Sequence, residues 1–162
     1  MKHSELNSSE IFEENKKKIS KLHLPLPVMP KYESPEFNWP DDPSNLNNTQ
    51  LGQMMLQMAG FYGYTQRLLG ILESELTLVD AELKLKVNAA SVPIRKELGR
   101  LNNEVIEAAV ISNNEEFTPL YKRKLELLSI RDQLQSRLLI YEKFYQALSR
   151  EQSRRDTETR IQ

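Results

Sequence analysis

The sequence contains no cysteine, and this absence removes several kinds of site at once. Without thiols the chain forms no disulfide bond, holds no zinc or iron–sulfur cluster through thiolates and has no cysteine nucleophile. Histidine is almost as scarce, because the chain has only His3 and His23, twenty positions apart. This spacing is not that of a paired-histidine metal motif, so we expect neither a metal centre nor a cofactor.

Long apolar runs are also missing. No stretch of about 18 apolar residues occurs, and the first ten residues lack the apolar segment of a secretory signal. We therefore expect no membrane span and a cytoplasmic location. Hydrophobic residues make up 39% of the chain and charged residues 28%, so the core is thin, elongated or completed by other subunits. No phosphate-binding loop, nucleophile elbow or convergent set of titratable groups is recognisable, and we expect no enzymatic activity.

The first 48 residues divide into a flexible segment and a proline-rich arm. Within residues 1–23 we expect a short helix from Ser8 to Ile19, with a serine cap, acidic residues in the first turn and lysines in the last. This helix either docks on the rest of the chain or stays mobile. Six of the eight prolines follow within residues 24–43. They exclude the interior of helices and sheets, and they predict an extended arm over residues 24–48.

The arm carries an unusual apolar load that includes Tyr32, Phe37 and Trp39. These side chains either dock within the same assembly or form a binding motif for a protein partner. We favour docking, because an exposed tryptophan in a free linker promotes non-specific association.

After the arm, apolar residues recur with separations that alternate between four and three. This heptad pattern is typical of a long helix packed along its length against other helices, and its positions are Leu51, Met55, Met58, Tyr62, Thr65, Leu69, Leu72, Leu76, Val79 and Leu83. We expect one helix over about residues 49–90. Ser91-Val92-Pro93 should end it, with the serine as the cap of a new helix and the proline in its first turn.

Two further features of this helix need an explanation. Gly52, Gly60, Gly63 and Gly70 each cost about 1 kcal/mol relative to alanine. A close crossing with another helix is the favoured compensation, and a kink between residues 60 and 64 is the alternative. The acidic residues do not match the pattern of di-iron bundles, so we assign them to a charged outer face; they are Glu73, Glu75, Asp80 and Glu82.

Two more helical segments complete the chain. A stripe continues to about residue 111 through Ile94, Leu98, Leu101, Val105 and Ala108, and residues 112–116 predict a turn. Thr118-Pro119 opens a last helix with a buried seam of Leu120, Leu127, Leu134, Leu138, Tyr141, Tyr145 and Leu148. A second set widens this seam, so that the helix faces more than one neighbour; it comprises Tyr121, Leu125, Leu128, Leu139 and Phe144.

These patterns together predict an all-α fold. We expect a long antiparallel helical hairpin or bundle with coiled-coil-like packing over residues 49–158, preceded by the extended proline-rich arm and followed by a tail over residues 159–162. A hairpin of two such helices leaves one side of each seam uncovered, and self-association is the usual remedy. The sequence therefore predicts a homo-oligomer.

Positive charge is concentrated in the last quarter of the chain. Residues 119–162 hold ten lysines and arginines against six acidic residues, so the remaining 118 residues hold twelve against seventeen. This asymmetry indicates an anionic partner or pairing between subunits, although a solvated helix is also rich in such residues. The candidate nucleic-acid contacts are Lys84, Lys86, Lys122, Arg123, Lys124, Arg150, Arg154 and Arg155.

The layout of residues 45–155 resembles the small helical proteins encoded by tailed bacteriophages. The resemblance is carried by the Leu51-Gly52 start, the Lys84-Leu85-Lys86 exit and the closing run from Ala147 to Arg155. The order of a long helix, a basic exit, Tyr121-Lys122-Arg123-Lys124 and a long final helix is also loosely similar to the UvsY-type recombination mediators. Those proteins form ring-like oligomers that bind single-stranded DNA and load a recombinase in place of single-strand binding protein.

Three hypotheses follow for the function. The resemblance implies a non-enzymatic recombination mediator in the bacterial host cell, which binds single-stranded DNA through the eight basic residues. In the alternative, the bundle is a protein-binding scaffold, assembly factor or inhibitor whose proline-rich arm captures a partner through Trp39, Phe37 and Tyr32. The plainest possibility is a coiled-coil structural subunit of a phage particle.

Overall fold

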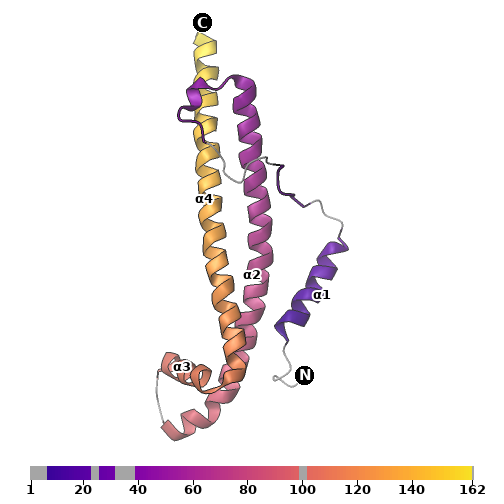
Figure 1. Cartoon of the computed structure of the whole chain (residues 1–162), viewed down its shortest axis with the longest axis vertical. Helices are drawn as coiled ribbons and strands as arrows, with labels where there is room; N and C mark the ends of the chain where they lie inside the picture. Colours follow the sequence, from indigo (N-terminus) through magenta and orange to yellow (C-terminus); the bar gives the residue numbers. More distant parts are fainter. Residues whose placement is uncertain (1–6, 23–25, 32–38, 99–101, 162) are drawn as a thin grey trace. The chain divides into compact units, whose positions relative to one another are not determined.

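The computed structural model describes residues 7–22, 26–31, 39–98 and 102–161, which form helices joined by short loops (Figure 1). In chain order the elements are helix α1 (Ser8–Ser20), the 3-10 helix η1 (Pro43–Asn45), helices α2 (Asn48–Leu98) and α3 (Asn103–Asn113), the 3-10 helix η2 (Glu115–Phe117) and helix α4 (Thr118–Ile161). No strand occurs within the described residues, and the all-α prediction is confirmed.

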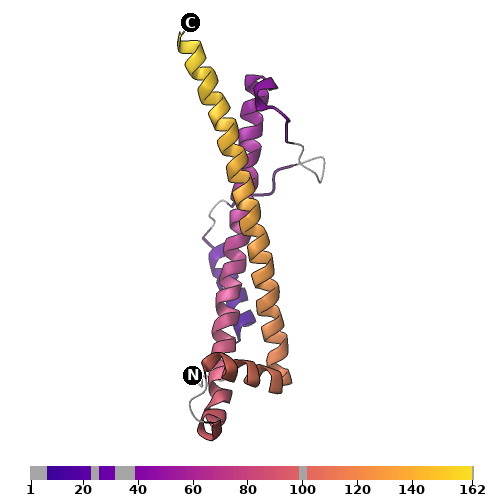
Figure 2. The same ribbon diagram turned by 90° about the vertical axis from the view of Figure 1, so that its left-hand side faces the viewer.

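The chain divides into two compact units, each of which contains a part of α2 and a part of α4. Unit 1 comprises α1, α2 from Gly70 onward, α3, η2 and α4 as far as Arg131. Unit 2 comprises residues 25–69 and 132–162. Within each unit the segments of α2 and α4 lie side by side in both views (Figures 1 and 2). The region predicted as one helical domain is thus shared between the two units.

The core of unit 1 forms where α3 and η2 fold back against α2. Its buried residues are Leu83, Val87, Ile106, Val110 and Phe117, and Ala90, Ile111 and Leu120 pack around them. Asn102 caps α3, because its side chain accepts a hydrogen bond from the backbone N–H of Glu104. The apolar surface that α3 buries holds the short segment between the two long helices in place.

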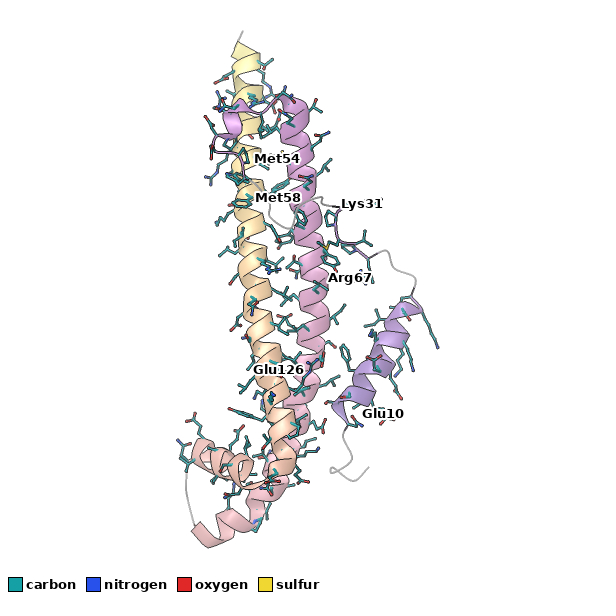
Figure 3. All side chains as sticks on the ribbon, viewed as in Figure 1. Glu10, Lys31, Met54, Met58, Arg67 and Glu126 are labelled. Carbon is teal, nitrogen blue, oxygen red and sulfur yellow. The ribbon has the colours of Figure 1, made fainter. Side chains whose placement is uncertain are left out.

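The core of unit 2 joins the start of α2 to the end of α4. Leu51, Met58, Phe61 and Leu148 are buried, and Trp39, Leu46, Met54, Met55, Tyr141 and Phe144 pack around them; Met54 and Met58 are labelled in Figure 3. The Trp39 and Phe144 rings stack with their centroids 4.1 Å apart, and those of Phe61 and Tyr141 are 5.5 Å apart. A reciprocal pair of hydrogen bonds between Asn47 and Gln50 caps α2 at this end.

The predicted seams are largely confirmed. All ten heptad positions of α2 except Tyr62 are buried or half-buried, and so are all positions of the α4 seam except Tyr145. Tyr62 is 40% exposed and Tyr145 41% exposed, so the prediction of burial is wrong for both. An α-helix drifts by about 20° per heptad, which carries some seam positions to the edge of the contact. A tyrosine tolerates this position because its hydroxyl favours water.

The predicted break at Ser91-Val92-Pro93 is wrong, because α2 continues through Pro93 to Leu98. Ser91 is buried, and its hydroxyl donates to the backbone carbonyl of Asn88 at 2.8 Å instead of capping a new helix. Figure 1 shows α2 changing direction near its C-terminal end, which is what a proline inside a helix produces. Packing of Val87 and Ala90 in the unit 1 core holds this part of the chain helical.

The stripe predicted for residues 94–111 also names the wrong buried positions within α3. A separate helix, α3, begins at Asn103, and it buries Ile106 and Val110 while Val105 is exposed. The prediction extended the register of the preceding helix, whereas α3 starts a new one after its own cap. Leu101 lies outside the described residues.

The glycines of α2 do not mark a close helix crossing. A Cβ atom at Gly60 would lie 2.8 Å from Cγ of Pro30, and one at Gly63 would lie 3.5 Å from Cβ and Cγ of Pro27, so both glycines face the proline-rich segment. At Gly52 and Gly70 a Cβ atom would meet none of the described atoms within 4 Å. Contact with the segment of residues 26–31 therefore replaces the predicted helix crossing at Gly60 and Gly63, and no contact accounts for the other two glycines.

Candidate functional site

Six of the eight basic residues singled out in the sequence form ion pairs within the chain. In unit 1, Asp80 receives two of them: Lys84 Nζ lies 2.6 Å from one carboxylate oxygen, and Lys124 Nζ lies 2.6 Å from the other. Burial raises the pKa of Asp80, but the hydrogen bonds from Lys124 and Lys84 outweigh it and hold the pKa below its ordinary value. The hydrogen bond to Asp80 also raises the pKa of Lys84. Asp80 on α2 thus links α2 to α4 through Lys124.

Arg123 makes a second link between the same helices. Its Nε and Nη2 atoms donate to one oxygen of Glu75 at 2.9 and 2.6 Å, and Nη1 lies 3.6 Å from Glu126. The hydrogen bond with Glu75 raises the pKa of Arg123. Lys86 pairs with Glu82 at 2.8 Å. Four of the candidates in unit 1 are therefore already engaged by carboxylates.

In unit 2, Glu151 on α4 gathers the other two paired arginines. Arg154 donates to both of its carboxylate oxygens and also pairs with Glu158, while Arg155 Nε donates to Glu151 at 2.7 Å. The hydrogen bonds from Arg154 and Arg155 lower the pKa of Glu151 to about 2. Arg150 and Arg154 share a helix face, as predicted, but the guanidinium of Arg154 is held by its acidic neighbours.

Arg155 joins three segments of unit 2. Besides Glu151, it donates from Nη1 to the side-chain oxygen of Asn48 at 2.8 Å and from Nη2 to the carbonyl oxygen of Ser44 at 3.0 Å. Its side chain is only 17% exposed. These contacts tie α4 to the first residue of α2 and to η1, which is a structural role that the sequence did not suggest.

Lys122 and Arg150 complete the set of eight. Both are exposed, and neither forms an ion pair within the part of the chain that the structure describes. The eight cations therefore do not form one patch, since five lie in unit 1 and three in unit 2.

The acidic partners were assigned from the sequence to a charged outer face, and this is wrong for Glu82, which is buried. The side chains of Glu75 and Asp80 are also mostly covered, with 22% and 26% exposed, whereas Glu73 is exposed. The pairs Asp80–Lys84 and Glu82–Lys86 have the i,i+4 spacing of helical ion pairs, so the sequence held this signal. Only the fold brings Lys124 to Asp80 and Arg123 to Glu75.

Glu82 also binds the N-terminus of α1, so the first helix docks on α2 and does not stay mobile. The backbone N–H of Ser8 donates to Glu82 at 2.7 Å, and Ser8 is buried. The cap of α1 is Asn7, not a serine, since its side chain accepts from the backbone N–H of Glu10. Burial raises the pKa of Glu82, but hydrogen bonds from Lys86 and Ser8 outweigh burial, and the pKa lies below its ordinary value.

This contact makes the docking of α1 sensitive to acid. The pKa of Glu82 is lower in the folded chain than the ordinary value of 4.5. The stabilising effect of this carboxylate is therefore complete above about pH 4.5 and is lost as the pH falls below that value. We expect the amide of Ser8 to exchange about tenfold faster in Glu82→Gln than in the wild type at neutral pH, because the charge-assisted bond is lost. Hydrogen exchange by NMR measures this.

A matched variant, Glu73→Gln, changes an exposed acidic residue of the same helix and should leave Ser8 protected. In the wild type, protection corrected for intrinsic exchange should fall between pH 5 and pH 3. Equal protection of Ser8 in both variants at neutral pH would contradict the assignment.

The aromatic residues of the arm cannot be compared as a group, since Tyr32 and Phe37 lie outside the described residues. Trp39 is half-buried and stacks on Phe144 in the unit 2 core. It therefore takes part in the packing of its own chain.

Exposed apolar side chains are found on α4. Tyr121 and Leu125 are exposed and Leu128 is half-buried. Their spacing of four and three residues places them on one face of the helix in unit 1. We call these three residues the α4 stripe. Two other members of the predicted second set lie in unit 2, where Leu139 is exposed and Phe144 is half-buried.

Other kinds of site were sought in the described ranges. No three histidine, aspartate or glutamate side chains gather there closely enough to hold a metal ion. A hollow of about 360 Å³ lies beside α1, lined in part by Ser9, Lys86, Glu116 and Arg123. Its two cations are those already paired with Glu82 and Glu75, so we assign it no ligand. None of the described helices is apolar over a length that would cross a membrane.

Comparisons with known proteins do not identify a relative. Neither a known protein family, nor a curated protein, nor a solved structure matches this chain.

Proposed function

We propose that the chain is a non-enzymatic helical scaffold that assembles with copies of itself and holds protein partners. The observation that carries this proposal is the α4 stripe, in which Tyr121 and Leu125 are exposed beside the half-buried Leu128. Full burial of one such side chain is worth about 1.5–3 kcal/mol. A second helix packed along the stripe would remove the exposed part of these side chains from water and so gain a part of this free energy for each of them.

The arrangement of charges supports the same proposal. Ion pairs within the chain already satisfy six of the eight candidate cations. They connect α2 to α4 in unit 1, and a hydrogen bond from Arg155 to Asn48 connects these helices in unit 2. A residue that holds its own fold together is less available to a phosphate. The apolar stripe, in contrast, has no partner within the described residues that buries it.

Sedimentation of the purified chain tests the proposal. We expect the wild type to sediment as an oligomer, and the double variant Tyr121→Gln/Leu125→Gln to sediment as a monomer, because two apolar contacts of the stripe are lost. The matched control, Glu126→Gln/Gln133→Ser, alters two exposed polar residues on another face of α4 and should leave the oligomer intact. A wild-type monomer at all concentrations would refute the proposal.

Loading of a recombinase onto single-stranded DNA is the second candidate function. It is favoured by the exposure of Lys122 and Arg150 without ion-pair partners in the described ranges, and by the 67% exposure of the Lys84 side chain. Exposed ion pairs contribute about 0–1 kcal/mol each, so phosphates can compete for such lysines. Several weak contacts per subunit would add up in an oligomer, and the recombinase and single-strand binding protein would be its protein partners.

A titration with labelled oligo-dT tests this candidate. Under this function, binding should weaken steeply between 50 and 200 mM salt, roughly in proportion to the number of phosphates contacted. The variant Lys122→Gln/Arg150→Gln should lower both the affinity and the salt dependence. The Leu56→Ala control changes no charge and lies outside the α4 stripe. Absence of binding by the wild-type oligomer at low salt would exclude the DNA function and leave the scaffold untouched.

A further inference from the structure

The segment of residues 26–31 lies against a face of α2 that is shaped for proline. The ring of Pro30 occupies the space where a side chain at Gly60 would be, and the ring of Pro27 lies within van der Waals contact of the Cβ position at Gly63. The later proline meets the earlier glycine, so the segment runs antiparallel to α2. Two prolines three residues apart thus face two glycines three residues apart.

Arg67 adds a polar contact one turn further along α2. Its Nη1 atom donates to the backbone carbonyl of Pro27 at 3.0 Å. Its Nε atom is buried and has no hydrogen-bond partner within the described residues. Figure 3 labels Arg67 on α2 and Lys31 at the end of the segment beside it. The guanidinium is therefore oriented toward a main-chain oxygen instead of a carboxylate, which is a contact that any proline-rich peptide can accept.

The spacing of the prolines fits the polyproline II helix, which repeats every three residues and has no internal hydrogen bonds. Prolines at i and i+3 lie on one side of such a helix, and its carbonyl groups are free to accept hydrogen bonds. The residues between and beside the prolines, Leu26, Val28 and Met29, are exposed. Contact with α2 therefore includes the two rings and one carbonyl, which are the two kinds of group that a polyproline II helix presents to a partner.

We propose that Gly60, Gly63 and Arg67 form a binding site on α2 for Pro-x-x-Pro peptides in the polyproline II conformation. In this chain the segment from Leu26 to Lys31 is the resident ligand, joined to its own site. The site lies in unit 2 and includes no residue of the α4 stripe, so it is independent of the proposed scaffold assembly.

The site is tested in the full chain by emptying it and refilling it. In the variant Pro27→Ala/Pro30→Ala, the resident rings are removed. The probe is a fluorescent peptide with the sequence of residues 24–31, and its binding is followed by anisotropy. Because a tethered ligand acts at an effective concentration in the millimolar range, we expect the emptied chain to bind the peptide at least about tenfold more tightly than the wild type does.

Three glycine substitutions then locate the site. Gly60→Ala in the emptied chain places Cβ 2.8 Å from the position of the Pro30 ring, and it should lower the affinity about tenfold. Gly52→Ala and Gly70→Ala lie outside the site and would meet none of the described atoms within 4 Å, so both should leave the affinity nearly unchanged. All three favour the helix, which separates a lost site from a lost fold.

A peptide with alanine in place of the two prolines is the matched probe control. The proposal holds if the proline peptide binds the emptied chain, the alanine peptide does not, and Gly60→Ala alone of the three glycine variants weakens binding. It is overturned if the wild type and the emptied chain bind the peptide equally, if the alanine peptide binds as well, or if no binding occurs. Sedimentation of the emptied chain reports on the scaffold separately.

Discussion

Replacement of Leu148 by alanine is expected to lower the free energy of unfolding by about 2–5 kcal/mol. Leu148 is fully buried on α4, where it packs with Leu51, Met58 and Phe61 of α2 in the core of unit 2. Truncation removes the transfer free energy of the lost atoms and leaves a cavity that rigid neighbours on two helices fill only in part. This core has few buried residues, so each contributes a large share of the apolar surface that the core buries.

Urea denaturation measures the effect, and the chain supplies its own probe. Trp39 is the sole tryptophan in the sequence and stacks on Phe144 beside Leu148, so its fluorescence reports on unit 2. The matched control is Leu56→Ala, the same substitution at a position of α2 that is 76% exposed, and it should change stability by less than about 0.5 kcal/mol. Equal losses in the two variants would show that unit 2 is not packed around Leu148.

The long helices were predictable because heptad spacing records burial directly. Apolar residues such as Leu69 and Leu83 recur at heptad spacing because these positions face a neighbouring helix, and both are buried as predicted. The continuation of α2 through Pro93 was not predictable, because the preference of proline for a first turn is a local tendency that favours a new helix there. Tertiary packing of Val87 and Ala90 overrode it.

The contacts made by polar and small residues were harder to predict for a different reason. Their own helix does not predict the partners of Arg123 and Lys124. Arg123 has Glu126 one turn away, but Glu75 and Asp80 lie more than forty positions earlier in the sequence. Gly60 suggested correctly that a neighbour approaches α2 closely. Nothing in its own helix indicates that the neighbour is Pro30, because the chain between them gives no periodic signal.

Arg155→Ala should lower the free energy of unfolding by about 1.5–3 kcal/mol, the range for hydrogen bonds that involve a charged group. The side chain holds Glu151, Asn48 and the carbonyl oxygen of Ser44 together. Its loss releases η1 and the first residue of α2 from α4, whereas Glu151 keeps its hydrogen bonds from Arg154. Arg150→Ala is the control on the same helix, because Arg150 is exposed and its substitution should change stability by less than about 0.5 kcal/mol.

The acid dependence of this loss separates a structural role from a DNA contact. The hydrogen bonds from Arg154 and Arg155 hold the pKa of Glu151 at about 2 in the folded chain, below the ordinary 4.5. The stabilising effect of the pair is therefore complete above pH 4.5 and falls as the pH approaches 2. The difference between the wild type and Arg155→Ala should shrink over this interval in urea titrations. If Arg155 served DNA alone, the variant would unfold like the wild type at every pH and lose only affinity for oligo-dT.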